Sequence, residues 1–178
     1  MKTLAIASAI LALGISAAHA EYPDRPINMI VSYSAGGGTD IAARTLAPFI
    51  EKYLGDDASI VVLNKPGAGG EIGFTELAQS KPDGYTIGFI NTPNLLTIPI
   101  QRKARYSLES LTPIANVIDD PDAFSFLPSS NIKSLEELIA YAKEHPGEVT
   151  YGTTGLGSDD HLSALEFERK TGVKLKHI

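Results

Sequence analysis

Short blocks of apolar residues alternate with longer amphipathic stretches along the chain from residue 22 onward. Apolar, β-branched runs predict strands, because such side chains suit a pleated and buried backbone. In the first half these runs cover residues 27–33, 59–63 and 85–90. Amphipathic periodicity predicts helices over residues 39–54, with Thr39 or Asp40 as N-cap, and over residues 71–80. Pro48 lies inside the first helix and lacks a backbone N–H, so we expect a kink or an early break there.

The same alternation continues in the second half. Strand-like runs there cover residues 113–118, 123–127, 149–153 and 173–178. The capping box Ser134–Glu137 predicts a helix that ends before His145, and residues 158–171 form a second helical stretch. Strands that alternate with helices through short connections indicate an α/β fold, whose parallel sheet is covered on both faces.

The first twenty residues have the order of a secretory signal. Lys2 precedes an apolar run over residues 4–15, and small residues follow up to Ala20, so cleavage is predicted after Ala20. The apolar run is about a dozen residues long, whereas a membrane span needs about 20; an uncleaved anchor is the alternative. A basic, polar stretch over residues 102–105 indicates a connection between two lobes. The predicted division is a signal peptide over 1–20, a first lobe over 21–101 and a second lobe over 102–178.

Composition and charge narrow the function. The chain carries 15 basic and 21 acidic residues, a formal net charge of −6, without a block of Lys or Arg. A nucleic-acid-binding protein would need a basic face, so no nucleic-acid partner is expected. The chain has no Cys, which excludes thiolate metal sites, redox pairs and cysteine nucleophiles. The sequence shows no metal-binding pattern of His and carboxylates, and we expect neither a metal nor a cofactor.

Glycines gather in three loops, each between a predicted strand and a predicted helix. We call residues 34–40 the first, residues 64–70 the second and residues 152–158 the third glycine loop. Parallel sheets bind ligands at this edge, and a helix N-terminus offers unpaired N–H groups to an anion. Short polar side chains add donors around the loops: Ser34, Thr39, Asn64, Thr153, Thr154 and Ser158. The pattern predicts a carboxylate or phosphate site, with tight turns that merely pack helix on strand as the alternative.

Nucleotide and catalytic sites fit less well. Residues 34–40 lack the dinucleotide pattern G-x-G-x-x-G, residues 155–160 match it only in part, and no P-loop pattern occurs. Ser158, Asp160 and His161 are triad residue types, but neighbours on one helix turn point in different directions. We expect Ser158 to cap the following helix, while His161 could reach the cleft or pack locally.

Five segments in order carry a family resemblance. They are Tyr22–Ile27, Ser34–Asp40, Asn64–Gly70, Lys81–Tyr85 and Gly152–Leu162. Together they resemble the Bug/TctC family, the periplasmic receptors of tripartite tricarboxylate transporters, over nearly all of the chain after residue 20. The resemblance implies a two-lobed α/β architecture of the periplasmic-binding-protein type II. Two α/β lobes would close on an organic anion, held largely by backbone N–H groups and ordered water.

The resemblance also implies a set of ligand-binding residues on both lobes. From the first lobe they are Ser34, Ala35, Gly36, Gly37, Gly38, Thr39, Asp40, Asn91, Thr92 and Asn94; from the second they are Gly152, Thr153, Thr154, Gly155, Ser158 and His161. The chain departs from the family in two respects. Asp159 and Asp160 stand where the family often has uncharged residues. Family members are also nearly twice as long, so we expect an N-terminal fragment that lacks the part completing the first lobe.

The predicted function is that of a periplasmic solute-binding protein without enzymatic activity. It would capture a small organic carboxylate between its lobes as a monomer and deliver it to the membrane permease subunits of a tripartite transporter. One alternative is a secreted α/β hydrolase or phosphatase that uses the glycine loops as an anion site. That alternative needs a nucleophile–base pair, which the sequence does not show. A second alternative is an interaction module in which the loops only turn the chain.

Overall fold

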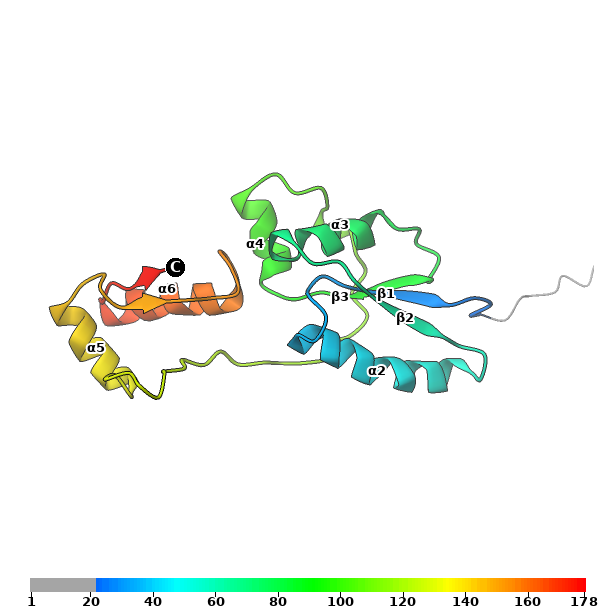
Figure 1. Cartoon of the computed structure of the whole chain (residues 1–178). Coiled ribbons are helices and arrows are strands. Elements are labelled where there is room, and N and C mark those ends of the chain that lie inside the picture. Colours follow the sequence, from blue (N-terminus) through cyan, green and yellow to red (C-terminus); the bar gives the residue numbers. More distant parts are fainter. Residues whose placement is uncertain (1–21) are drawn as a thin grey trace, which may run out of the picture.

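A parallel three-stranded sheet forms the centre of the first half of the molecule. The computed structural model describes residues 22–178, so the predicted signal peptide lies outside the described residues. The elements of the first half are β1 (Ile27–Val31), α2 (Gly38–Leu54), β2 (Ile60–Asn64), α3 (Glu71–Gln79), β3 (Thr86–Phe89) and α4 (Asn94–Gln101). The strand order is β2-β1-β3, with both pairs parallel. Figure 1 shows α2 on one face of this sheet and α3 on the other, which confirms the predicted layering.

The apolar faces of these elements form two clusters. Met29 and Val31 of β1 pack with Ala43 of α2 on one face of the sheet. On the other side, Phe74 of α3 packs with Leu95 and with residues further along the chain. Burying such side chains removes apolar area from water, which is the main source of stability for a layered α/β unit.

Helix α2 corrects two expectations. Its N-cap is Gly37, so Thr39 and Asp40 lie in the first turn instead of capping it. The predicted break at Pro48 is wrong, because the helix continues to Leu54. The alanines Ala43 and Ala47, which precede Pro48 in this helix, are buried, and their packing outweighs the loss of one hydrogen bond.

Helix α4 was not expected from the sequence. It carries Pro99 within a short apolar run, and it has too few polar residues to form the polar face by which an amphipathic helix is recognised. Tertiary contacts stabilise it: Leu95 and Ile98 are buried beside Tyr106, whose hydroxyl donates to the Leu95 carbonyl at 2.9 Å. Burial raises the pKa of Tyr106 to about 12.

The second half contains a smaller parallel pair of strands. Its elements are the 3₁₀ turn η2 (Leu108–Ser110), α5 (Leu135–Glu144), β4 (Thr150–Tyr151), α6 (Asp159–Thr171) and β5 (Lys176–His177). Strands β4 and β5 pair in parallel. The predicted helices and the last two predicted strands are confirmed, although both strands are shorter than expected. Ser134 caps α5 by accepting from the Glu137 N–H at 3.2 Å. Glu137 Oε2 accepts from the Lys133 N–H instead of from Ser134, so the capping box is only half formed.

The strands predicted over residues 113–118 and 123–127 are wrong. Residues 111–127 form neither helix nor strand, and Figure 1 shows this segment as a long extended connection. A strand requires a hydrogen-bonded neighbour, and these residues have none among the described ones. Their apolar side chains are correspondingly open: Ile114 is 84% exposed and Leu127 is 73% exposed. The sequence pattern identified an extended segment but not the absence of a partner.

Candidate functional site

All three glycine loops lie where the sequence predicts them. The first loop joins β1 to α2, the second joins β2 to α3, and the third joins β4 to α6. Because β1 and β2 are parallel, the first two loops lie at the same edge of the sheet, beyond the carboxyl ends of the strands. This is the edge at which open α/β sheets bind ligands.

Three polar side chains within residues 91–97 each contact a different glycine loop. The bonds are Asn91 Nδ2 to Thr39 Oγ1 at 3.1 Å, Asn94 Nδ2 to the Gly69 carbonyl at 3.2 Å and Thr97 Oγ1 to the Gly157 carbonyl at 2.8 Å. Their spacing of three residues suits one side of a helical turn. The three loops therefore have a common neighbour, the start of α4, although they lie far apart in the sequence.

The first loop is held by a buried carboxylate. Asp40 is 3% exposed. Its oxygens accept from the Gly36 N–H at 2.8 Å, from Arg44 Nε at 3.0 Å and from Asn64 Nδ2 at 2.9 Å. Asn64 Nδ2 also donates to the Tyr33 carbonyl at 3.0 Å. These bonds join the ends of β1 and β2 to the first turn of α2, so Asp40 fixes the shape of the loop.

The hydrogen bonds of Asp40 also set its protonation. The bond from Arg44, with those from Gly36 and Asn64, lowers the pKa of Asp40 to about 2. The carboxylate is therefore ionised near neutral pH and is occupied by its three partners. Asp40 is placed to shape the predicted site and not to offer a free group to a ligand.

The exposed part of the first loop keeps free donors. Gly37 N–H donates to the Ser34 carbonyl at 3.3 Å. The N–H groups of Gly38 and Thr39, in the first turn of α2, have no acceptor among the described residues, as expected for a helix start. Asn91 Oδ1 is buried beside this turn and has no hydrogen-bond partner. Unpaired polar groups thus cluster where the helix dipole favours an anion.

The second loop behaves largely as a packing turn. A Cβ on Gly70 would lie 2.8 Å from Phe74 and 3.2 Å from the Tyr33 hydroxyl. Gly70 also has a φ of 102°, which favours glycine. Arg102 fixes this loop by donating to the Ala68 carbonyl and to Glu71, each at 2.7 Å. The glycines here chiefly allow close approach of backbone to side chains.

The third loop is held by its own acidic residue. Asp160 accepts from the Thr154 N–H at 2.8 Å and from the His161 N–H at 3.0 Å, and it contacts the Ser158 hydroxyl. Ser158 is fully buried and caps α6, as predicted, by accepting from the His161 N–H. The bonds from Ser158, Thr154 and His161 lower the pKa of Asp160 although desolvation opposes them.

The predicted site residues therefore divide by their contacts. Asp40, Asn94, Ser158 and the Thr154 amide are engaged within the protein. Ser34, Ala35, Gly38 and Thr92 are exposed. The hydroxyl groups of Ser34 and Thr92 have no hydrogen-bond partner among the described residues. The sequence missed Thr97 because the helix on which it lies was itself missed. It also missed Tyr33, whose hydroxyl lies at the second loop and whose pKa is raised to about 12 by burial and by the charge of Asp159.

Ser158, Asp160 and His161 do lie together, but not as a catalytic triad. The His161 backbone N–H, and not its ring, reaches Ser158 Oγ, at 3.3 Å. The ring nitrogen Nδ1 instead accepts from the Gly157 N–H at 3.0 Å. A nucleophile needs a base at its hydroxyl, and this arrangement supplies none. Within residues 22–178, no group of three or more His, Asp or Glu side chains is placed to hold a metal.

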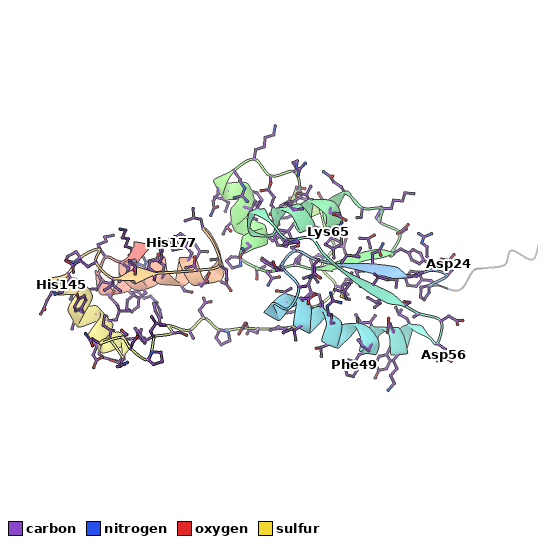
Figure 2. All side chains as sticks on the ribbon, viewed as in Figure 1. Asp24, Phe49, Asp56, Lys65, His145 and His177 are labelled. Carbon is purple, nitrogen blue, oxygen red and sulfur yellow. The ribbon has the colours of Figure 1, made fainter. Side chains whose placement is uncertain are left out.

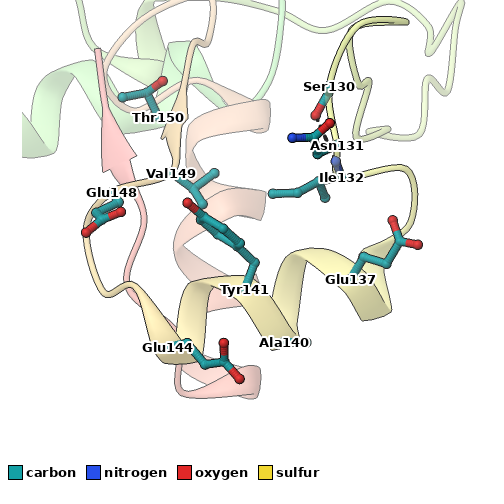
Figure 3. Close-up of a pocket in the computed structure, with 10 residues that line it drawn as sticks. All are labelled: Ser130, Asn131, Ile132, Glu137, Ala140, Tyr141, Glu144, Glu148, Val149 and Thr150. Carbon is teal, nitrogen blue, oxygen red and sulfur yellow. Dashed lines mark hydrogen bonds between the residues drawn. The ribbon is translucent and has the colours of Figure 1, made fainter.

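Two hollows lie in the second half of the molecule. One of about 600 Å³, shown in Figure 3, lies between α5 and the start of β4. Its lining residues are Ser130, Asn131, Ile132, Glu137, Ala140, Tyr141, Glu144, Glu148, Val149 and Thr150. The other, of about 340 Å³, lies under the third loop and includes Gly152, Thr153 and Asp160 beside Phe124 and Leu138. The first shares no residue with the glycine loops, whereas Gly152 and Thr153 of the third loop line the second.

The length and hydropathy of the helices bear on whether any of them could cross a membrane. None of them within residues 22–178 has both the length and the hydropathy that a membrane-spanning helix requires.

Sequence comparisons match the chain to a known family and to individual relatives. The family model described as the tripartite tricarboxylate transporter family receptor, TctC, matches residues 42–178. A Cupriavidus necator protein, named UPF0065 protein in gbd 5′ region, is 37% identical over 97% of this chain and 54% of its own length. Protein BugT of Bordetella pertussis is 39% identical over 97% of this chain and 53% of its own length. The chain thus spans about half the length of the curated relatives it matches.

Solved structures place the same fold in known binding proteins. The R. palustris protein Rpa4515, solved with adipate, superposes with a TM-score of 0.77 at 30% identity, over 88% of this chain and 52% of that one. The periplasmic binding protein BugD gives a TM-score of 0.69 at 32% identity, over 88% and 52% of the two chains. MatC from Rhodopseudomonas palustris, with bound malate, gives a TM-score of 0.69 at 25% identity, over 88% and 53%. The matching family is one of transporter receptors, and the hydrolase alternative has no support from these comparisons. With its α/β architecture and its match over residues 42–178, the chain belongs to the TctC family of tripartite tricarboxylate transporter receptors.

Proposed function

We propose that the protein is the solute-binding component of a tripartite transporter and captures a small aliphatic dicarboxylate. Its relatives of known structure carry adipate and malate. The observation that supports this most directly is the contact of all three glycine loops with residues 91–97. A ligand placed there would contact loops from both halves of the chain, and ligands that contact two lobes favour their closed arrangement.

The capture of a carboxylate would rely on backbone and amide donors, since the nearby cations are already paired. Arg44 is bonded to Asp40, Arg102 to Glu71 and Lys65 to Glu76. The free donors are the Gly38 and Thr39 N–H groups at the start of α2. Charge-assisted hydrogen bonds from such amides are about twice as strong as neutral ones.

Asn91 adds a donor to this set. Rotating its side-chain amide by half a turn exchanges Oδ1 and Nδ2 without changing its shape. Thr39 Oγ1 would then donate to Oδ1, since a hydroxyl serves as donor or acceptor, and the buried unpaired position would become an NH₂ group. An NH₂ group facing the α2 N-terminus suits a carboxylate oxygen, whereas an unpaired carbonyl does not.

Calorimetric titration of the full-length protein with succinate, malate and adipate tests the proposal. We expect heat and a raised melting temperature with at least one of them. The matched variant is Gly38→Ala, because a Cβ at Gly38 meets nothing within 4 Å and the fold should be unaffected. Alanine keeps the backbone N–H, but its Cβ would stand in the open space through which the ligand approaches and would lengthen one charge-assisted bond. Such a bond is worth about 1.5 kcal/mol or more, so binding should weaken about tenfold. Absence of heat with all three ligands in the wild type would refute the proposal.

We further propose that the mature protein begins at Glu21 and acts in the periplasm. The family is described as one of receptors, and two similar proteins of known structure are described as periplasmic. The order of charge, apolar run and small residues over residues 1–20 supports export of this chain. N-terminal sequencing of protein recovered from the periplasm should begin at Glu21; recovery from the cytoplasm with Met1 retained would contradict this.

A further inference from the structure

His161, in the first turn of α6 beside the third glycine loop, is held in one tautomer by the backbone. Its Nδ1 accepts from the Gly157 N–H at 3.0 Å. That nitrogen cannot carry a proton while it accepts one, so the neutral ring has its proton on Nε2. The His161 N–H is bonded to Asp160 and Ser158, and the Thr154 N–H to Asp160. Among the described residues of this loop, Gly157 is the one whose N–H is held by an imidazole.

A second imidazole lies directly beside the first. The ring centres of His161 and His177 are 4.7 Å apart. His177 Nε2 bonds to Thr153 Oγ1 at 2.7 Å, and its ring lies 5.0 Å from that of Tyr151. Figure 2 shows His177 on the short C-terminal strand beside α6. Two imidazolium ions at this distance would repel each other.

The charged groups on the neighbouring elements do not bond to the His161 ring. On α6, the Asp160 carboxylate accepts from Thr154, Ser158 and the His161 N–H, and the exposed Asp159 makes no hydrogen bond to the ring. On β4, burial raises the pKa of the Tyr151 hydroxyl. No carboxylate of these residues is hydrogen-bonded to the His161 ring to balance a proton on it. An anion bound at the third loop would supply that balance.

We propose that carboxylate binding at the third glycine loop is coupled to uptake of a proton by His161. The anion would compete with Nδ1 for the Gly157 N–H, and release of this bond leaves Nδ1 free to take a proton from solvent. The imidazolium would then donate to the carboxylate, so that ligand and proton stabilise each other. This inference rests on the proposed function, because it concerns the same ligand at the same site.

Proton uptake is measured by titrating the full-length protein in two buffers of different ionisation enthalpy. With succinate, malate and adipate at about pH 7, where imidazole titrates, the apparent heat of whichever ligand binds should depend on the buffer. The slope should correspond to uptake of a fraction of a proton, at most one. His161→Gln should bind with no buffer dependence, because the glutamine amide can accept from Gly157 but cannot protonate.

Matched variants separate this assignment from other sources of protons. His145→Gln should retain the wild-type slope, because His145 follows α5 and stacks on Tyr141 instead. His177→Asn should also retain uptake. A zero slope in the wild type, a slope that survives His161→Gln, or a slope lost only in His177→Asn would each overturn the proposal while leaving the binding function intact. Absence of any binding would overturn both.

Discussion

At the scale of single residues, each glycine loop is fixed by a carboxylate from the first turn of the helix that follows it. Asp40 holds the first loop, Glu71 meets the arginine that clamps the second, and Asp160 holds the third. Acidic residues in a first turn also complement the helix dipole. An anion-binding surface built in this way offers only the amides that its own carboxylates leave free.

Asp40→Asn should destabilise the protein in a pH-dependent manner. The pKa of Asp40 is lowered from 3.8 to about 2 in the folded state. Its ionised form therefore stabilises the fold fully above about pH 4, and this contribution is lost as the pH falls toward 2. Melting temperatures of wild type and variant should differ most near neutral pH and converge at low pH. A constant difference across this range would show that ionisation of Asp40 is irrelevant.

Substitutions of Gly37 and Gly38 in the first loop should have different effects on the melting temperature. A Cβ at Gly37 would lie 3.3 Å from the Ser34 carbonyl, so bulky side chains there disturb the loop as well as any ligand. Gly38 faces open space. Gly38→Ala should therefore leave the melting temperature within about 1 °C of wild type or raise it, because alanine favours the helix, whereas Gly37→Val should lower it. Equal melting temperatures for both variants would contradict this contrast.

At the scale of elements, caps and periodicity made much of the fold predictable. Ser158 and Ser134 were identified as helix starts from the sequence alone, and both accept the expected backbone bonds. The features that could not be predicted from the sequence are those that depend on contacts between distant segments. Helix α4 depends on packing against Phe74 and Tyr106, and residues 111–127 lack the strand partner that their composition would suit.

Ser158→Ala should be the more costly of two matched cap removals. Loss of an N-cap costs about 1 kcal/mol in general. Ser158 is fully buried, and its hydroxyl also contacts the Gly155 carbonyl at 2.7 Å and the Asp160 carboxylate, whereas Ser134 only caps α5. Chemical denaturation should give a larger loss of unfolding free energy for Ser158→Ala than for Ser134→Ala. The opposite order would mean that the third loop is not held as described.

At the scale of the whole molecule, residues 91–97 connect the loops of both halves. The resemblance placed Asn91, Thr92 and Asn94 near the site, and the structure adds the direct contact of Thr97 with Gly157. Gly157 has a φ of 79°, which favours glycine, and a Cβ there would lie 3.1 Å from Thr97 Oγ1, so glycine suits this approach of the third loop to α4. Such a contact between distant segments has no signature in local sequence, which explains why it was not foreseen.

Thr97→Val should weaken ligand binding more than it weakens the fold. The substitution keeps the shape of the side chain but removes the hydroxyl that bonds to Gly157 at 2.8 Å. We expect about a fivefold loss of affinity, as for one neutral hydrogen bond. Thr171→Val is the matched control, because its hydroxyl bonds only within α6, to Phe167. Equal affinities for both variants would show that this contact does not position the third loop.

Backbone amides that converge on a carboxylate can be observed one by one in a ¹⁵N-resolved NMR titration of the full-length protein with adipate. We expect the largest changes in chemical shift at the backbone N–H groups of Gly38 and Thr39. The N–H of Gly157 should also shift, because its bond to His161 is released. The glycines that end α2 and α6, Gly55 and Gly172, should stay unchanged. Saturable binding that leaves the Gly38 and Thr39 amides unmoved would contradict the account.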